Sequence, residues 1–168
     1  SEGSYRLVFT EPLLFAALSD PRLYLHIPDD PPASIEALAA TFRRLCSGGH
    51  PDRGERWFNW LMRERGTGAA VGTLQATTYA DRRAEIGYMV LFEHWRRGHG
   101  VEGGRWLVDR LGADPAVDLI EAHVDTRNLA SIRLLERVGF RRTTSASRDE
   151  YRYELRVGMA RRAVIVRQ

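Results

Sequence analysis

Two glycines and two arginines stand close together in the segment Trp95-Arg96-Arg97-Gly98-His99-Gly100-Val101, between a predicted strand and a predicted helix. Glycines at this spacing let the backbone curl, so that successive N–H groups point toward one position. Such a helix start binds anions through its exposed amides and its dipole. The glycines leave room for a bulky pyrophosphate, and Arg96 and Arg97 would add charge-assisted hydrogen bonds. The segment therefore predicts a phosphate-binding loop, with an ordinary glycine-containing turn as the alternative.

The same glycines also fit the G-x-G-x-x-G fingerprint of dinucleotide-binding folds, in which an acidic residue follows about 20 residues later. The matching positions are Gly98, Gly100 and Gly103, followed by Asp118 and Glu121. In that fold the first glycine directly follows a strand, whereas here the polar stretch from Phe92 to Arg97 intervenes. Too few strands follow to build two mononucleotide-binding halves. The dinucleotide interpretation is therefore the less favoured one.

The loop has to be positioned by a strand before it and a helix after it. Turn residues separate three predicted strands, which are Trp57 to Arg65, Val71 to Tyr79 and Ala84 to Leu91. These strands form an antiparallel meander. A helix from Gly98 to Leu111 and a strand from Val117 to Val124 follow. A strand, a helix and a strand in succession make a parallel, right-handed crossover.

Shorter elements flank this central part of the chain. They are a strand from Tyr5 to Thr10, a helix from Pro12 to Leu18, a helix after the N-cap Ser34 that ends at Gly48-Gly49, a helix from Asn128 to Val138 ended by Gly139, and strands from Arg141 to Ala146 and from Tyr151 to Val157. The sequence therefore predicts a mixed α/β fold in a single domain that spans residues 1–168.

The composition limits the environment and the partners. The chain has 168 residues, 43% of them hydrophobic, and Cys46 is its one cysteine, so a disulfide framework is excluded and a reducing cytoplasm is expected. No apolar run is long enough to cross a bilayer, and no membrane partner is expected. All 25 basic residues are arginine, but acidic residues alternate with them and the net charge is +3, so no nucleic-acid partner is expected.

Metal chemistry is not expected either. The five histidines show no ligand spacing such as H-x-x-x-H, so we interpret them as structural or solvated. They are His26, His50, His94, His99 and His123.

Two segments resemble the cofactor-binding motifs of the GNAT N-acetyltransferases. The run from Ile86 to Glu102 resembles the family's coenzyme A motif, which reads Gln or Arg, two residues, Gly, one residue, then Gly or Ala. Asn128 to Ser131, followed by Leu135 to Arg141, resembles the next motif, particularly in the branch related to the ribosomal-protein N-acetyltransferases RimJ and RimL. The two motifs stand in the family's order and distance, and the resemblance extends weakly from Tyr5 to about Val157.

The resemblance implies a GNAT fold with acetyl-CoA as co-substrate. Its central sheet is mostly antiparallel, and the two parallel strands of its crossover splay apart where the pantetheine arm inserts. Val90 would then offer its backbone amide and carbonyl groups to the cofactor, and Asn128 would touch the pantetheine arm. The implied pyrophosphate contacts come from the backbone of Arg97, Gly98, His99, Gly100 and Val101.

Three residues depart from the family's pattern. Trp95 stands at the Gln or Arg position, as is common in the RimJ and RimL branch, and Phe92 stands where proline is usual. Leu135 replaces the tyrosine with which many GNAT enzymes protonate the departing thiolate. Another residue must fill that role, and the resemblance to the RimJ and RimL branch implies Ser131.

The chemistry implied by the resemblance needs few protein groups. An acetyl thioester is already activated, so the protein must hold an amine in attack geometry and stabilise the developing oxyanion. The amine must also lose a proton, either to a carboxylate through water or to bulk solvent. Glu85 is the best candidate for that carboxylate. The alternative is that Glu85 is a solvated residue on the outer face of the sheet, because strand alternation does not fix which face borders the cleft.

The acceptor and the assembly state stay open at this point. Resemblance to the RimJ and RimL branch favours a peptide N-terminal amine, and a small amine such as an aminoglycoside or a polyamine is the second hypothesis. A non-catalytic acyl-CoA-binding module is the third, suggested by Leu135. Asp29 and Asp30 would attract a cationic amine, unless they form only a solvated, proline-rich turn. Both a monomer and a homodimer are compatible with the sequence.

Overall fold

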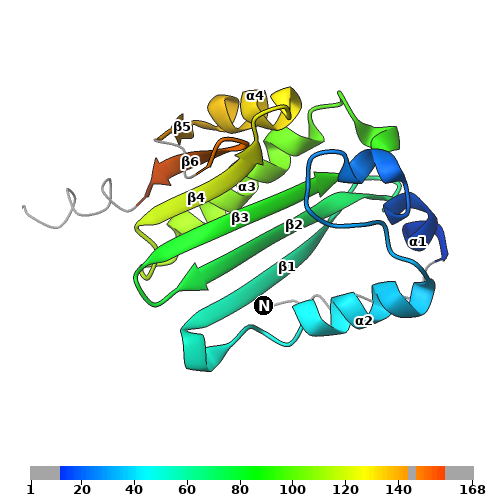
Figure 1. Ribbon diagram of the computed structural model, residues 1–168, viewed down its shortest axis with the longest axis horizontal. Coiled ribbons are helices and arrows are strands. Elements are labelled where there is room, and N and C mark those ends of the chain that lie inside the picture. The colour runs from blue at the N-terminus through cyan, green and yellow to red at the C-terminus, as the bar shows by residue number, and fades with distance from the viewer. Residues whose placement is uncertain (1–11, 144–146, 158–168) are drawn as a thin grey trace, which may run out of the picture.

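The fold is a mixed sheet with helices against it, and a computed structural model describes residues 12–143 and 147–157 (Figure 1). In chain order the elements are α1 (Pro12–Leu18), a 3-10 helix (Pro21–Tyr24), α2 (Ile35–Leu45), a 3-10 helix (Pro51–Arg53), β1 (Glu55–Arg63), β2 (Ala70–Tyr79), β3 (Arg83–Val90), a 3-10 helix (Phe92–His94), α3 (His99–Gly112), β4 (Leu119–Asp125), α4 (Leu129–Val138), β5 (Arg141–Arg142) and β6 (Glu150–Arg156). The strand predicted from Tyr5 to Thr10 lies outside the described residues.

The six-stranded sheet has the order β1-β2-β3-β4-β6-β5. Every neighbouring pair is antiparallel except β3 and β4, which are parallel and joined through α3. This arrangement confirms the predicted mixed sheet and its strand-helix-strand crossover. Figure 1 shows α3 passing behind the strands, so that its first turn meets the end of β3.

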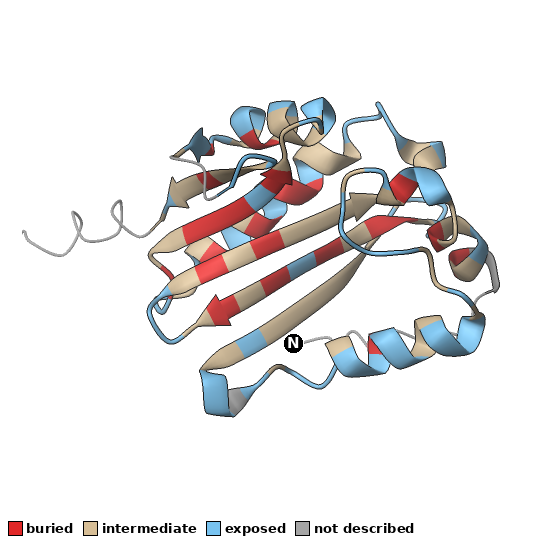
Figure 2. Ribbon diagram, in the orientation of Figure 1, coloured by how far each residue is buried: buried red, intermediate tan, exposed pale blue. Residues whose placement is uncertain are grey.

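The two faces of the sheet bury different sets of residues. On the face that packs against α3 and α4, the core includes Ile86 of β3, Leu107 of α3 and Ile120 of β4. On the opposite face, α1 and α2 pack against Leu61 of β1 and Met89 of β3. Because successive residues of a strand point to opposite faces, these two clusters fix the orientation of every side chain along β3. In Figure 2 buried residues, drawn red, recur along the central strands.

Local signals set most element boundaries. The Ser34 hydroxyl accepts a hydrogen bond from the Ala37 amide at 3.1 Å and starts α2. Gly139 ends α4 at a φ of 112°, in the left-handed region, so both predicted helix caps are confirmed. β4 starts at Leu119 rather than at Val117, because the Val117 amide bonds the Asp114 carbonyl in the preceding turn.

Candidate active site

The parallel strands β3 and β4 separate soon after they meet. Their pairing covers three residue pairs and, within the described residues, ends at Glu85 opposite Glu121. β3 continues to Val90 and β4 to Asp125, so backbone groups beyond that point face a gap rather than a partner strand. We refer to this space between the two diverging strands as the β3–β4 gap.

Val90 turns its backbone groups into the β3–β4 gap. The Leu91 amide donates to the Val71 carbonyl of β2 at 2.9 Å. Because hydrogen-bonding direction alternates along an antiparallel strand, the Val90 N–H and C=O point away from β2. The Trp95 indole Nε1 donates to the Val90 carbonyl oxygen at 2.7 Å. The departure from the family motif at Trp95 thus has a structural role, since it ties the loop to the end of β3.

The glycine loop curls as its sequence predicts. Arg96 and Gly98 both have left-handed backbone, with φ of 60° and 88°. Gly98 is the N-cap of α3, and its carbonyl accepts the first helical bond from the Glu102 amide at 3.1 Å. The amides of the first turn have no acceptor within the helix. A Cβ on Gly98 would meet nothing within 4 Å, so the residue faces open space.

Gly100 faces a close neighbour, unlike Gly98. A Cβ on Gly100 would lie 2.6 Å from Cδ1 of Leu134, a residue of α4. The second glycine of the motif therefore leaves room for the Leu134 side chain between α3 and α4. The starts of both helices line the same groove, which is described below.

The start of α4 presents Asn128 and Ser131 to the β3–β4 gap. Asn128 Oδ1 accepts from the Ser131 amide at 3.0 Å and caps the helix. The Ser131 Oγ lies 2.5 Å from the phenolic oxygen of Tyr88, which comes from β3. Burial raises the pKa of Tyr88 to about 12. Leu135 is 1% exposed within the core, so its position on α4 does not offer a side chain to the gap.

Tyr88 is a site residue that the sequence analysis missed. It lies two residues before Val90, on the strand that borders the gap. Its place on that strand was the one signal in the sequence. A side chain two residues before Val90 lies on the same face of the sheet as Val90.

Glu85 lies on the face of the sheet opposite α3 and α4, because its neighbours Ala84 and Ile86 are in the α3 core. Its Oε2 accepts a hydrogen bond from the Tyr79 hydroxyl at 3.1 Å. Burial, with the Glu85 charge as a second cause, raises the pKa of Tyr79 to about 12. Glu121, opposite Glu85, is 2% exposed and is held by Arg83 and Arg152.

One large groove joins these features through the β3–β4 gap. Its volume is about 1260 Å³, and it reaches both Glu85 on one face of the sheet and Ser131 on the other. The lining includes most of the sequence-predicted site residues, namely Glu85, Val90, Arg96, Gly98, His99, Gly100, Val101, Asn128 and Ser131, together with Asp29 and Asp30. Arg97 is exposed and does not belong to that lining.

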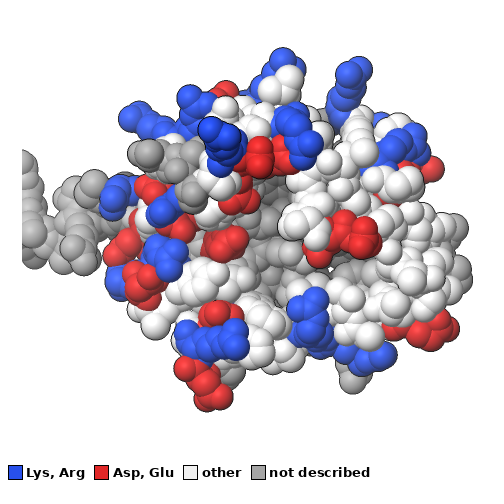
Figure 3. All heavy atoms as spheres, in the orientation of Figure 1, with Lys and Arg blue, Asp and Glu red and all other residues white. Residues whose placement is uncertain are grey.

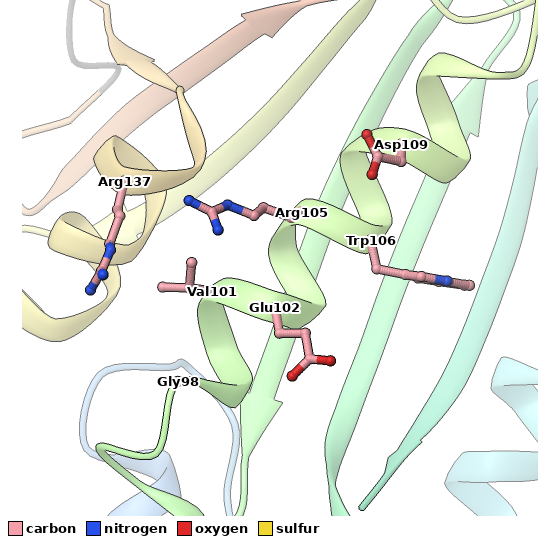
Figure 4. Close-up of a pocket in the computed structure, with 7 residues that line it drawn as sticks. All are labelled: Gly98, Val101, Glu102, Arg105, Trp106, Asp109 and Arg137. Carbon is pink, nitrogen blue, oxygen red and sulfur yellow. The ribbon is translucent and has the colours of Figure 1, made fainter. Parts of the chain in front are cut away.

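A smaller hollow of about 440 Å³ lies beside the glycine loop, on the outer side of α3 and α4 (Figure 4). In Figure 4, Arg105 extends from α3 toward α4, where Arg137 lies. Gly98 and Arg137 line both the hollow and the large groove. Glu102 and Asp109 line the hollow beside the two arginines, so acidic and basic groups are balanced there.

The described residues can be compared with the requirements of a metal site and of a membrane-spanning helix. Among them, no three His, Cys, Asp or Glu side chains gather in a way that could hold a metal ion. None of their helices has both the length and the apolar character that a bilayer span needs.

The chain belongs to the GNAT family of acetyltransferases. Residues 10–141 match the family described as "Acetyltransferase (GNAT) domain". The family resemblance of the sequence motifs is thereby confirmed at the level of the superfamily, while its narrower RimJ and RimL assignment stays a prediction.

Individual relatives agree with this membership. The chain is 31% identical over 131 residues to the uncharacterized N-acetyltransferase YoaA of Bacillus subtilis (strain 168), covering 77% of this chain and 72% of that protein. Its fold is similar to spermidine N-acetyltransferase from Vibrio cholerae in complex with CoA and spermine, with a TM-score of 0.70 at 17% identity over 86% of this chain and 88% of that one. It is also similar to aminoglycoside acetyltransferase AAC(6')-Ib in complex with coenzyme A, with a TM-score of 0.65 at 17% identity over 86% and 87% of the two chains.

The bond between Trp95 and Val90 can be tested without a ligand. In Trp95→Phe the indole donor is lost, so we expect the free energy of unfolding to fall by about 1 kcal/mol. Amides 96–101 should exchange with deuterium faster than in the wild type. Trp106→Phe is the matched control, because both tryptophans are 43% exposed and the Trp106 ring packs against Trp60 of β1. Equal loop exchange in the two variants would contradict this role of Trp95.

Proposed function

We propose that this protein transfers an acetyl group from acetyl-CoA to a primary amine. The observation that carries the proposal is the β3–β4 gap, with unpaired backbone along one side and the first turn of α3 at its mouth. Open space at Gly98 and the guanidinium groups of Arg96 and Arg137, which line the large groove, suit a phosphorylated ligand. Membership of the GNAT family and the coenzyme A complexes of two similar folds support the same ligand.

In this proposal the cofactor follows the gap from the loop inward. Its pyrophosphate accepts hydrogen bonds from the backbone amides of residues 97–101, with the Arg96 side chain beside it. The Val90 amide, which points into the gap, bonds the pantetheine arm, since the carbonyl of Val90 already accepts from Trp95. The Asn128 side chain keeps its Nδ2 for the same arm, because its Oδ1 caps α4.

The reaction is a direct transfer. The amine nitrogen attacks the thioester carbonyl, a C–N bond forms, and the C–S bond then breaks. Glu85 takes the proton that the nitrogen loses, through a water molecule, on the side of the sheet that faces α1 and α2. The Ser131 hydroxyl donates to the departing sulfur on the other side. The two roles are thus separated by the sheet and joined by the gap.

We propose a small cationic amine as the acceptor. Acids and arginines both line the groove, and the acids that would attract an amine are Asp29, Asp30 and Glu85. Asp125 also lines the groove, but its carboxylate is paired with the Arg127 guanidinium, which holds its pKa well below the ordinary value, so we do not assign it to the amine. The similar folds include enzymes named for spermidine and for aminoglycosides. A peptide N-terminal amine, suggested by the RimJ and RimL resemblance, is the competing acceptor.

Charge on the face drawn in Figure 3 is consistent with a small ligand rather than a long polyanion. Among the described residues, acidic and basic side chains are intermixed there and do not form a stripe of one sign.

Gly98→Trp tests the cofactor site. The indole would occupy the space where phosphate approaches, so we expect acetyl-CoA to bind roughly 100-fold more weakly, which corresponds to the loss of about two hydrogen bonds to a charged group. Titration calorimetry measures the dissociation constant. Gly66→Trp is the matched control, because Gly66 has a φ of 94° and open space around it, but lies in the turn between β1 and β2. Unchanged affinity in Gly98→Trp would contradict the assignment.

Glu85→Gln tests the proton acceptor. We expect kcat to fall by about 100-fold or more, because an amide cannot take the amine proton. The activity should recover at high pH, where the amine loses its proton in bulk solvent, and the acetyl-CoA dissociation constant should not change. Glu150→Gln, on the same face of the sheet at β6, is the control. A kcat equal to that of the control would assign Glu85 to the alternative role of a solvated surface residue.

A thiol-release screen over spermidine, kanamycin and short peptides tests the acceptor. We expect turnover with a polyamine or an aminoglycoside and little with peptides. Replacing Asp29 and Asp30 together by alanine should raise the acceptor KM about 3- to 10-fold, since exposed charges contribute modestly. A preference for peptides, or an unchanged KM in the double variant, would contradict the small-amine proposal.

A further inference from the structure

We propose that Tyr88 and Ser131 form a two-hydroxyl donor chain for the departing thiolate, in which Tyr88 is the positioning residue behind Ser131. This inference rests on the proposed function. Ser131 then acts on the sulfur, and the strand residue Tyr88 holds and polarises the serine hydroxyl. The juxtaposition that carries it joins two hydroxyls from different elements at the β3–β4 gap.

The chain has one direction in this proposal. The Tyr88 phenolic oxygen lies 2.5 Å from Ser131 Oγ and 3.4 Å from the Ser131 carbonyl oxygen. Either hydroxyl can donate in the 2.5 Å contact, and we assign the donor to Tyr88 because a phenol is the stronger acid of the two hydroxyls. The hydrogen of Ser131 is then free to point to a third atom. Because Asn128 holds the Ser131 amide, the serine keeps its place at the gap.

Two other residues near Ser131 cannot donate to its hydroxyl in place of Tyr88. Leu135 on α4 is 1% exposed and carries no polar atom. Tyr153 of β6 has a hydroxyl, but that hydroxyl donates to Glu136 Oε1 at 3.1 Å. Tyr88 and Ser131 both line the large groove together with Val90, so they share the space assigned to the thioester arm.

The atoms and charges balance. When the C–S bond breaks, the sulfur keeps the bonding electrons and leaves as a thiolate, which accepts the hydrogen bond of Ser131 while Ser131 Oγ accepts that of Tyr88. The thiolate takes a proton from water as coenzyme A leaves, and this proton equals the one that the amine loses on the other side of the sheet. The raised pKa of Tyr88 keeps its hydrogen in place at neutral pH before the reaction.

The test compares coenzyme A with desulfo-coenzyme A, which lacks the thiol, and needs no acceptor amine. A donor chain stabilises the thiolate, so the thiol pKa in the complex falls below its free value. Binding of coenzyme A should then tighten as the pH rises from the bound pKa toward the free pKa. Desulfo-coenzyme A reports every other titration at the site. The groups concerned are Tyr153, whose charge acts on Tyr88, and His26, Glu85, His94, His99, His123 and Asp125, which line the groove.

In the wild type, we expect the preference for coenzyme A over desulfo-coenzyme A to grow about 10-fold between about pH 7 and about pH 9, the range in which thiols ionise. Tyr88→Phe and Ser131→Ala should each reduce that growth to about twofold or less, and the double variant should be no worse than either. Ser131→Thr, which keeps a hydroxyl, should retain the effect. Tyr153→Phe, which also removes a buried tyrosine hydroxyl, is the control for folding and should behave as the wild type.

Each remaining outcome has a definite meaning. If Tyr88→Phe keeps the full pH-dependent preference, or if the wild type shows none, the donor chain is overturned. Loss of the effect in Ser131→Ala alone would leave the serine acting without Tyr88, which also overturns the inference but not the proposed function. If neither ligand binds the wild-type protein, the proposed function itself fails.

Discussion

The separation of β3 from β4 is the constraint on which the rest of the site depends. Parallel strands normally continue their hydrogen bonds along their common length, but here the bonds end after three residue pairs. The crossover through α3 holds the two strands at one end and places a helix start at the other. Unpaired backbone and an anion-binding helix terminus are therefore produced together, by the same break in the sheet.

That break also gives the site two sides. Glu85 reaches the groove from the face covered by α1 and α2, whereas Tyr88 and Ser131 reach it from the face covered by α3 and α4. In the proposed reaction, one group takes a proton from the amine and another donates a hydrogen bond to the departing sulfur. The two groups must not exchange the proton directly with each other. A sheet with an opening keeps them apart while both remain in contact with one substrate.

Local features of the fold could be predicted from the sequence, and contacts between distant segments could not. The caps at Ser34 and Gly139 depend on neighbouring residues, so their positions were predicted correctly. The bond between Tyr88 and Ser131 joins residues 43 positions apart and depends on how α4 packs, which no spacing reveals. The face on which Glu85 lies follows from the two hydrophobic cores, one on each side of the sheet, and strand alternation alone does not determine it. Gly100 fits the motif, but its close contact with Leu134 required the packing of two helices.

The most direct test of this account is amide hydrogen exchange with and without acetyl-CoA. We expect added acetyl-CoA to slow exchange at Val90 and at residues 97–101, while Leu91, whose amide already bonds Val71, changes little. Protection confined to another part of the chain, or none at saturating acetyl-CoA, would show that the gap between β3 and β4 is not where the thioester lies.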